Sequence, residues 1–244
     1  MPISVMKKKF IHICSLIILL GFGRVYAQTL QVVTKTIERT FAYKGNETLQ
    51  LYAERSDIEI NTWARNEVKV VIELSAKHPD RAIAEKDVEV LRYVAEKLGK
   101  VISLRNFVVL PTKSPKPESN LKARFVLLVP AACTVEIKNT FGRTTLKGLQ
   151  KETRLYTEFC QAELRELKGK LALNTHFGSL QVIDFEGEIN LTSERTDVVV
   201  RAIKGKGNIR TLFGSLDIQA DKTVVKLDIE TKNTELRNGT VANK

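Results

Sequence analysis

Apolar residues recur at a fixed interval in the second half of the chain. Three Phe-Gly pairs lie 36 residues apart, and two related pairs fall midway between them, giving Phe141-Gly142, Phe159-Cys160, Phe177-Gly178, Arg195-Thr196 and Phe213-Gly214. The underlying period is therefore 18 residues. Within each period apolar and polar residues alternate, which is typical of a β-strand with one buried face.

Aligning six units on this period gives columns of similar residues. We call the first residue of each pair the anchor. Four positions before the anchor the column is apolar, with Ile137, Leu155, Leu173, Leu191, Ile209 and Ile229. Two positions before the anchor it is small and polar, with Asn139, Thr157, Thr175, Ser193, Thr211 and Thr231. We expect this polar column to point inward and to form a hydrogen-bonded ladder.

One unit cannot bury its apolar face alone, but units stacked about 4.8 Å apart would pair their strands and share a core. The predicted fold class is therefore all-β: a single-stranded parallel β-solenoid, right-handed, with 18-residue coils, plus one inserted α-helix. An antiparallel sandwich is the competing architecture, but it would not require columns that hold an 18-residue spacing.

The first half of the chain contains one more stretch in the same register, at residues 49–63, with Arg55 at the anchor position. Alternating residues predict further strands at 30–43, 68–74, 101–110 and 123–129. Between them, Asp80 is placed to cap a helix over about 81–98, and Gly99 follows its expected end.

The N-terminus has the three-part layout of a secretory signal peptide. Lys7, Lys8 and Lys9 precede an apolar run at 10–22, and a small-residue cleavage pattern ends at Ala27. The run is shorter than the roughly 20 residues that span a membrane, and an uncleaved anchor is the alternative. We expect a signal peptide at 1–27 and one β-solenoid domain at 28–244, with an insertion at about 78–122. The protein would then be exported, to the periplasm or to the cell surface and medium.

The charge balance of the chain is basic. Removing the four basic residues of 1–27 lowers the formal net charge from +11 to +7. Basic and acidic residues are interleaved through most of the rest, which is typical of a solvated surface. An exported basic protein would meet an envelope protein or an anionic polysaccharide, and we expect one of these as its partner. We expect no nucleic acid, and no transmembrane segment after signal cleavage.

The sequence offers little catalytic chemistry. It contains no paired Cys-x-x-Cys, no His-Glu-x-x-His and no phosphate-binding glycine loop, so we predict no catalytic residue and no cofactor. Cys133 and Cys160 fall in different corner columns, which predicts two free thiols. One position before the anchor, Glu158, His176 and Glu194 would form an outward ladder that could hold a metal ion. A structural ladder of favourable cross-strand pairs explains the same residues.

Two stretches of this sequence resemble the bacterial putative-adhesin family of exported proteins. One is 57–63, Asp-Ile-Glu-Ile-Asn-Thr-Trp, followed by 67–70, Glu-Val-Lys-Val; the other is the strand 125–129 with Pro130 and 135–137, Val-Glu-Ile. The resemblance implies a β-solenoid in the cell envelope and brings no catalytic residues. The predicted function is a non-enzymatic adhesin, or a surface or periplasmic binding scaffold. The alternative is a carbohydrate-active β-helix enzyme similar to polysaccharide lyases.

Overall fold

The computed structural model describes residues 29–112, 115–219 and 225–237, and most of them lie in strands. The strands are β1 (Gln31–Ala42), β2 (Thr48–Glu54), β3 (Ser56–Trp63), β4 (Glu67–His78), β5 (Leu91–Leu98), β6 (Val101–Val108), β7 (Asn120–Pro130), β8 (Thr134–Lys147), β9 (Glu152–Gln219), β10 (Val225–Lys232) and β11 (Glu235–Arg237). The described ranges contain one helix, α2 (Arg81–Val88). The compact unit of the chain begins at Gln31. The predicted signal peptide, 1–27, lies outside the described residues.

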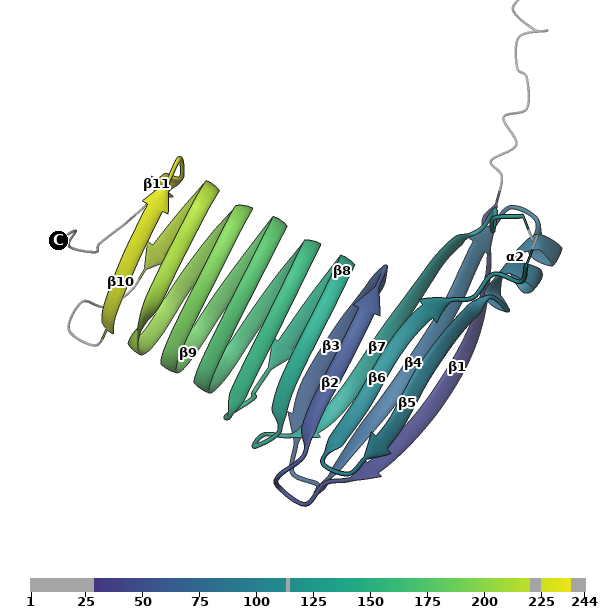
Figure 1. The fold of residues 1–244 in the computed structure, drawn as a ribbon, viewed down its shortest axis with the longest axis horizontal. Helices are drawn as coiled ribbons and strands as arrows, with labels where there is room; N and C mark the ends of the chain where they lie inside the picture. Colours follow the sequence, from purple (N-terminus) through teal and green to yellow (C-terminus); the bar gives the residue numbers. More distant parts are fainter. Residues whose placement is uncertain (1–28, 113–114, 220–224, 238–244) are drawn as a thin grey trace, which may run out of the picture. The chain divides into compact units, whose positions relative to one another are not determined.

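The prediction of a single-stranded parallel β-solenoid is wrong, because the sheet is mixed. Its strand order begins β1-β4-β7-β3-β8-β2-β6-β5 (Figure 1). Strand β4 pairs antiparallel with both β1 and β7, and β5 pairs antiparallel with β6. The predicted columns cover β2, β3 and the residues from β8 onward. The strands outside those columns follow no 18-residue spacing. Strands β6 and β7 pair parallel with β2 and β3, whereas β1, β4 and β5 pair antiparallel with their neighbours.

Parallel pairing joins the segments that do share columns. Strand β8 pairs with β9 so that Val135 lies opposite Thr153 and Leu146 opposite Leu164, 18 residues apart in each case. Strand β2 pairs with β8, which places Leu49 opposite Val135, the position to which the sequence aligns it. Like side chains therefore lie beside one another in neighbouring strands.

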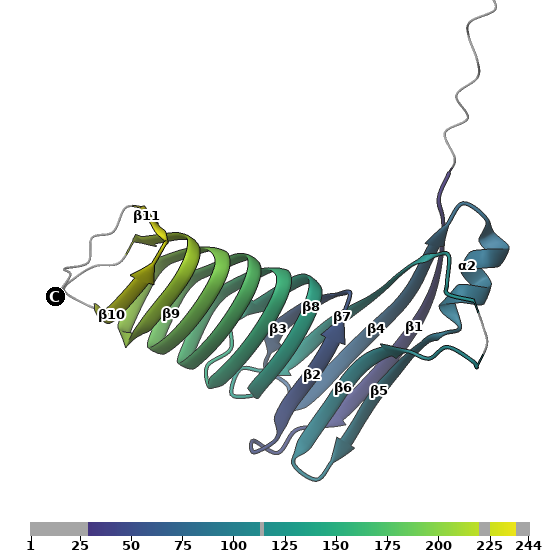
Figure 2. The same ribbon diagram turned by 45° about the horizontal axis from the view of Figure 1, so that its top comes forward.

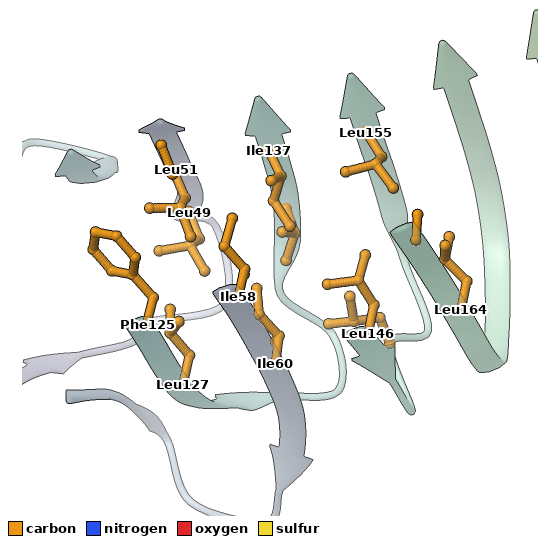
Figure 3. Close-up of a cluster of buried hydrophobic side chains, with 14 of the residues drawn as sticks. Leu49, Leu51, Ile58, Ile60, Phe125, Leu127, Ile137, Leu146, Leu155 and Leu164 are labelled. Atoms are coloured by element: carbon orange, nitrogen blue, oxygen red, sulfur yellow. The ribbon is translucent and has the colours of Figure 1, made fainter. Parts of the chain in front are cut away.

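These pairings produce one apolar core. Leu49, Ile60, Leu127 and Leu146 are completely buried, although they come from four strands far apart in the sequence. Figure 3 shows how they gather with Phe125 and the leucines and isoleucines of neighbouring strands. Truncating a buried Leu or Ile to Ala costs about 2–5 kcal/mol, so each of these side chains contributes measurably to stability.

Residues with positive φ bend the extended chain at the anchor positions. Phe141, Phe159, Phe177 and Phe213 have φ between 52° and 59°, and Arg195 has φ 48°. A second series of bends lies seven residues later in β9, at Glu166, Asp184 and Ala202. Bulky residues rarely adopt this conformation. At the anchors the phenylalanine rings stack, with centroids 5.0 Å apart for Phe141–Phe159 and 4.6 Å for Phe159–Phe177.

The position after the anchor alternates between glycine and a small hydrogen-bond donor. In chain order it is occupied by Ser56, Gly142, Cys160, Gly178, Thr196, Gly214 and Thr234. The carbonyl of Glu158 accepts a hydrogen bond from Cys160 Sγ at 3.2 Å, and the carbonyl of Glu194 accepts one from Thr196 Oγ1 at 2.9 Å. This alternation explains why Phe-Gly recurs every 36 residues although like positions are paired every 18.

The expected polar ladder forms only in part. Asn139, Thr157, Thr175, Ser193 and Thr211 are all buried, as the column predicts. The side-chain amide of Asn139 donates to Ser56 O at 3.0 Å and to Thr144 Oγ1 at 3.1 Å. Within the described protein, however, the hydroxyls of Thr175, Ser193 and Thr211 have no hydrogen-bond partner. The hydroxyl column is therefore a run of small buried side chains rather than a continuous network.

The inserted helix is shorter than predicted. Asp80 caps it as expected, because Asp80 Oδ1 accepts a hydrogen bond from Ala82 N at 2.8 Å. The helix ends at Val88, and residues 91–98 form β5 instead of its second half. Gly99, at φ 58°, lies in the two-residue loop of the β5–β6 hairpin, where a positive φ at the first position fits the twist of the strands. Figure 2 shows α2 at one end of β1 and β4. In the described part of the chain, no helix has the length and apolar character needed to cross a membrane.

Candidate binding groove

A groove of about 1090 Å³ lies on the outward face formed by β2, β8, β9 and β10. Its polar side chains alternate with buried leucines and isoleucines along each strand, so they point away from the core. One column of this face contains Glu136, Arg154, Ala172, Asn190, Asn208 and Asp228. The adjacent column contains Tyr52, Lys138, Tyr156, Asn174, Thr192, Arg210 and Glu230. The sheet thus presents two parallel rows of hydrogen-bonding and aromatic groups.

Aromatic side chains mark the β2 end of the groove. The Tyr52 hydroxyl donates to Glu136 Oε1 at 3.1 Å, and burial together with this carboxylate raises the pKa of Tyr52. The ammonium of Lys138 lies 5.0 Å from the ring centroid of Tyr156, a cation–π distance. The centroid of the His176 ring lies 5.9 Å from that of Tyr156, with the two rings tilted by 38°. These contacts hold the Tyr156 ring in place at the surface.

Amides occupy the middle of the groove. Asn208 Nδ2 donates to Asn190 Oδ1 at 3.2 Å, and Asn174 and Thr192 lie in the neighbouring column. An amide side chain offers two donors and an acceptor with two lone pairs, so each retains free hydrogen-bonding capacity. Three basic and three acidic side chains line the whole groove, which leaves it without a net charge.

The predicted ladder of Glu158, His176 and Glu194 lies beside this groove. His176 Nδ1 is 3.6 Å from Glu194 Oε2, and Glu194 Oε1 also accepts a hydrogen bond from Arg195 at 2.9 Å. Glu158 makes no hydrogen bond or ion pair with His176. Among the described residues, no group of three His, Cys, Asp or Glu side chains is placed to hold a metal ion. The contacts fit a cross-strand pair better than a metal site.

Cys133 and Cys160, the two cysteines among the described residues, are free and buried. Burial raises the pKa of the Cys133 thiol to about 12, and it also raises the pKa of Cys160. A thiol of this kind stays protonated at neutral pH and is a poor nucleophile. The two cysteines therefore contribute to packing rather than to chemistry.

The sequence analysis missed the groove residues, because the one outward column it considered was that of Glu158, His176 and Glu194. The signal was present in the same alignment. Five and three positions before the anchor, the outward columns contain two Tyr, three Asn and one Thr besides their charged residues, whereas a merely solvated strand would favour Lys and Glu throughout.

Comparison with known proteins gives a structural likeness only. No family model and no curated protein matches the sequence. A putative adhesin from Bacteroides fragilis NCTC 9343 is 13% identical, with 83% of this chain and 96% of that chain covered and a TM-score of 0.44. A putative adhesin from Parabacteroides merdae ATCC 43184 is 11% identical, with 84% and 95% covered and a TM-score of 0.37. A putative cell adhesion protein from Clostridium sporogenes ATCC 15579 is 9% identical, with 84% and 98% covered and a TM-score of 0.33.

All three structures are named as a putative adhesin or a putative cell adhesion protein. At these identities and TM-scores the likeness by itself supports no function for this chain.

Proposed function

We propose that this protein is a non-enzymatic, adhesin-like binding protein of the cell envelope, and that the groove on its sheet face binds a polysaccharide. The observation that carries the proposal is the pair of outward columns that join the exposed Tyr52 and the half-buried Tyr156 to a row of asparagine side chains. The domain that follows the predicted signal peptide would act in the periplasm or at the cell surface.

The chemistry of the groove suits a polyhydroxylated chain. Asparagine and threonine side chains both donate and accept hydrogen bonds, as sugar hydroxyls do. Tyrosine rings offer flat apolar surface together with a hydroxyl. The groove is open along several paired strands, and a polymer can therefore contact many of them at once.

The charged groups of the groove support binding over catalysis. Arg210 is paired with Glu230 at 3.0 Å, Arg154 with Glu152 at 2.7 Å, and Glu136 accepts from Tyr52. A catalytic acid or base must be within hydrogen-bond reach of the substrate proton, and these carboxylates are instead engaged with neighbouring side chains of the sheet. A polysaccharide lyase is therefore the less favoured function.

The test is binding of the mature chain to a panel of neutral and acidic polysaccharides by affinity electrophoresis. We expect Asn174→Ala combined with Asn190→Ala to weaken binding at least about tenfold, or about 1.4 kcal/mol. The matched control is Gln161→Ala combined with Gln181→Ala, which removes two amides outside the groove and should leave binding unchanged. Equal binding by both double variants, or binding to no polymer of the panel, contradicts the proposal.

Product analysis of the same mixtures separates binding from cleavage. New unsaturated chain ends would support the lyase function and contradict the non-enzymatic one. Retention of intact polymer is the expected result.

A further inference from the structure

A second pocket, of about 900 Å³, adjoins the groove at Tyr52 and Lys138, which line both. Its charge differs sharply from that of the groove. Five basic side chains line it, Arg55, Arg105, Lys116, Lys122 and Lys138, against one acidic side chain, Glu54. A low-dielectric recess lined by one sign of charge concentrates ions of the opposite sign. We call it the basic pocket.

The pocket is built by buried polar contacts rather than by a loose surface loop. Asn106 is buried, and its amide donates to Glu54 O at 2.8 Å while its Oδ1 accepts from Glu54 N at 3.2 Å. These bonds join β6 to the end of β2. Asp87, at the end of α2, accepts hydrogen bonds from the backbone amides of Glu118 and Ser119 at 2.9 and 2.8 Å. These two hydrogen bonds hold residues 118 and 119 in place, and with them the neighbouring Lys116.

The Asp87 carboxylate is itself well stabilised. Burial alone would raise its pKa, but the hydrogen bonds from residues 118 and 119 outweigh burial, and the pKa is lowered. Asp87 therefore stays charged at neutral pH and keeps this side of the basic pocket in position.

Most cations of this pocket lack a carboxylate partner. Lys122 pairs with Asp57 at 2.5 Å. Arg105 instead lies 5.6 Å from the ring centroid of Phe107, and Lys138 lies over Tyr156. In the described ranges no carboxylate lies within 4.0 Å of a charged nitrogen of Arg55, Arg105, Lys116 or Lys138. Elsewhere on the sheet, exposed arginines commonly pair across or along strands, as Arg124 does with Glu59 and Glu73.

We propose that the basic pocket binds the anionic group, a carboxylate or a sulfate, of an acidic sugar in the polysaccharide that occupies the groove. This inference rests on the proposed function and names its ligand class. Arginine and lysine together supply bidentate and point-charge contacts to such a group. Leu91, Phe107 and Val108 also line the pocket and offer apolar contact to the ring of the sugar.

Continuity with the groove supports a polymer as the occupant. Because Tyr52 and Lys138 line both cavities, a chain bound across the asparagine columns can extend directly into the basic pocket. The groove has no net charge, so the basic pocket supplies the selection for acidic over neutral chains.

The test compares three polymers by isothermal titration calorimetry: polygalacturonate, dextran sulfate and neutral dextran. The variant is Arg55→Gln combined with Lys116→Gln. The control is Arg201→Gln combined with Lys204→Gln, which makes the same change of charge outside the pocket. We expect the pocket variant to lose at least about tenfold in affinity for an acidic polymer, with a weaker dependence on salt. The control variant should keep the affinity of the wild type.

The outcomes distinguish this inference from the function on which it rests. If the pocket variant binds the acidic polymers as tightly as the control, the inference is overturned. If wild-type protein binds neutral dextran as tightly as the acidic polymers, the inference is again overturned, while the groove proposal stands. If none of the three polymers binds, both fall.

Discussion

Gly178 packs directly against the backbone of Cys160, and a Cβ atom added at Gly178 would lie 1.9 Å from the Cys160 carbonyl oxygen. Gly142 stands in the same relation to Ser56, and Gly214 to Thr196 at 2.4 Å. In each of these pairs the glycine leaves room for the backbone carbonyl of the hydrogen-bond donor residue on the neighbouring strand.

Replacing Gly178 by alanine should destabilise the protein strongly. The new methyl group would collide with backbone that cannot move without breaking the strand pairing, and the residue has φ 134°. We expect a loss of more than about 3 kcal/mol in the free energy of unfolding. Gly45→Ala is the control, because Gly45 also has a positive φ but no atom within 4 Å of an added Cβ. It should cost only about 1–2 kcal/mol in urea unfolding. Similar losses of unfolding free energy for Gly178→Ala and Gly45→Ala would show that the close contact of Gly178 with the Cys160 carbonyl does not contribute to the cost.

Replacing Cys160 by threonine should destabilise the protein less than replacing it by valine. Its thiol donates to the carbonyls of Glu158 and Asn139, and Thr196 makes the equivalent bonds to Glu194 and Thr175. Valine has the shape of threonine without the donor, so Cys160→Val should cost about 1 kcal/mol more than Cys160→Thr. Thermal unfolding of the two variants measures the difference. Equal stability would mean that the position selects only for size.

At the stacked phenylalanines, ring stacking stabilises the fold while the positive φ destabilises it. Phe159 stacks on Phe141 and Phe177 but has φ 53°. Phe159→Ala loses stacking worth about 0.5–1.5 kcal/mol per pair and keeps the strained backbone. Phe159→Asn loses the same stacking but tolerates positive φ better. We therefore expect the asparagine variant to be the more stable of the two in chemical unfolding. The reverse order would show that strain at this position is negligible.

Glu47 makes stability sensitive to acid. Its hydrogen-bonded partner Lys97, 2.6 Å away, and the amide of Lys44 lower the pKa of Glu47 from 4.5 to about 2. A lowered pKa in the folded state contributes stability above the ordinary value, and this contribution is lost as the pH falls from about 4.5 to about 2. The stability difference between wild type and Glu47→Gln, followed by urea unfolding, should therefore shrink across this window. In a Lys97→Met background the same difference should be smaller at neutral pH. A difference that does not change with pH would contradict this account.

The sequence predicts most where the buried face is set by alternation. Leu49 lies opposite Val135 because both belong to an apolar column, and strand β1 at Gln31–Ala42 nearly matches the expected 30–43. It fails where a longer-range contact decides. Leu91, Ala95 and Leu98 fit one face of a helix, but Leu91, Tyr93 and Ala95 fit one face of a strand equally well, and pairing with β6 selects the strand. The antiparallel pairing of β4 with β7 likewise depends on contacts that no column reveals.

For the candidate site, the sequence identified the Glu158–His176–Glu194 column, whose geometry fits a cross-strand pair, and missed the tyrosines and asparagines beside it. Outward side chains are not constrained by packing in the core. Whether they form a binding site therefore depends on which other side chains lie beside them in the folded protein. Tyr52 and Tyr156 are 104 positions apart and come into one groove only because β8 lies between β2 and β9 and pairs with both.

The alternation of glycine and donor after each anchor limits how the chain can change length. Deleting 142–177 would join Phe141 to Gly178 and leave a glycine next to Ser56, as now. Deleting 142–159 would instead bring Cys160 against Ser56, where the native neighbour has no side chain. Evolution or design should therefore lengthen and shorten this protein in double steps of 36 residues, and a gene duplication of a single 18-residue unit would be selected against.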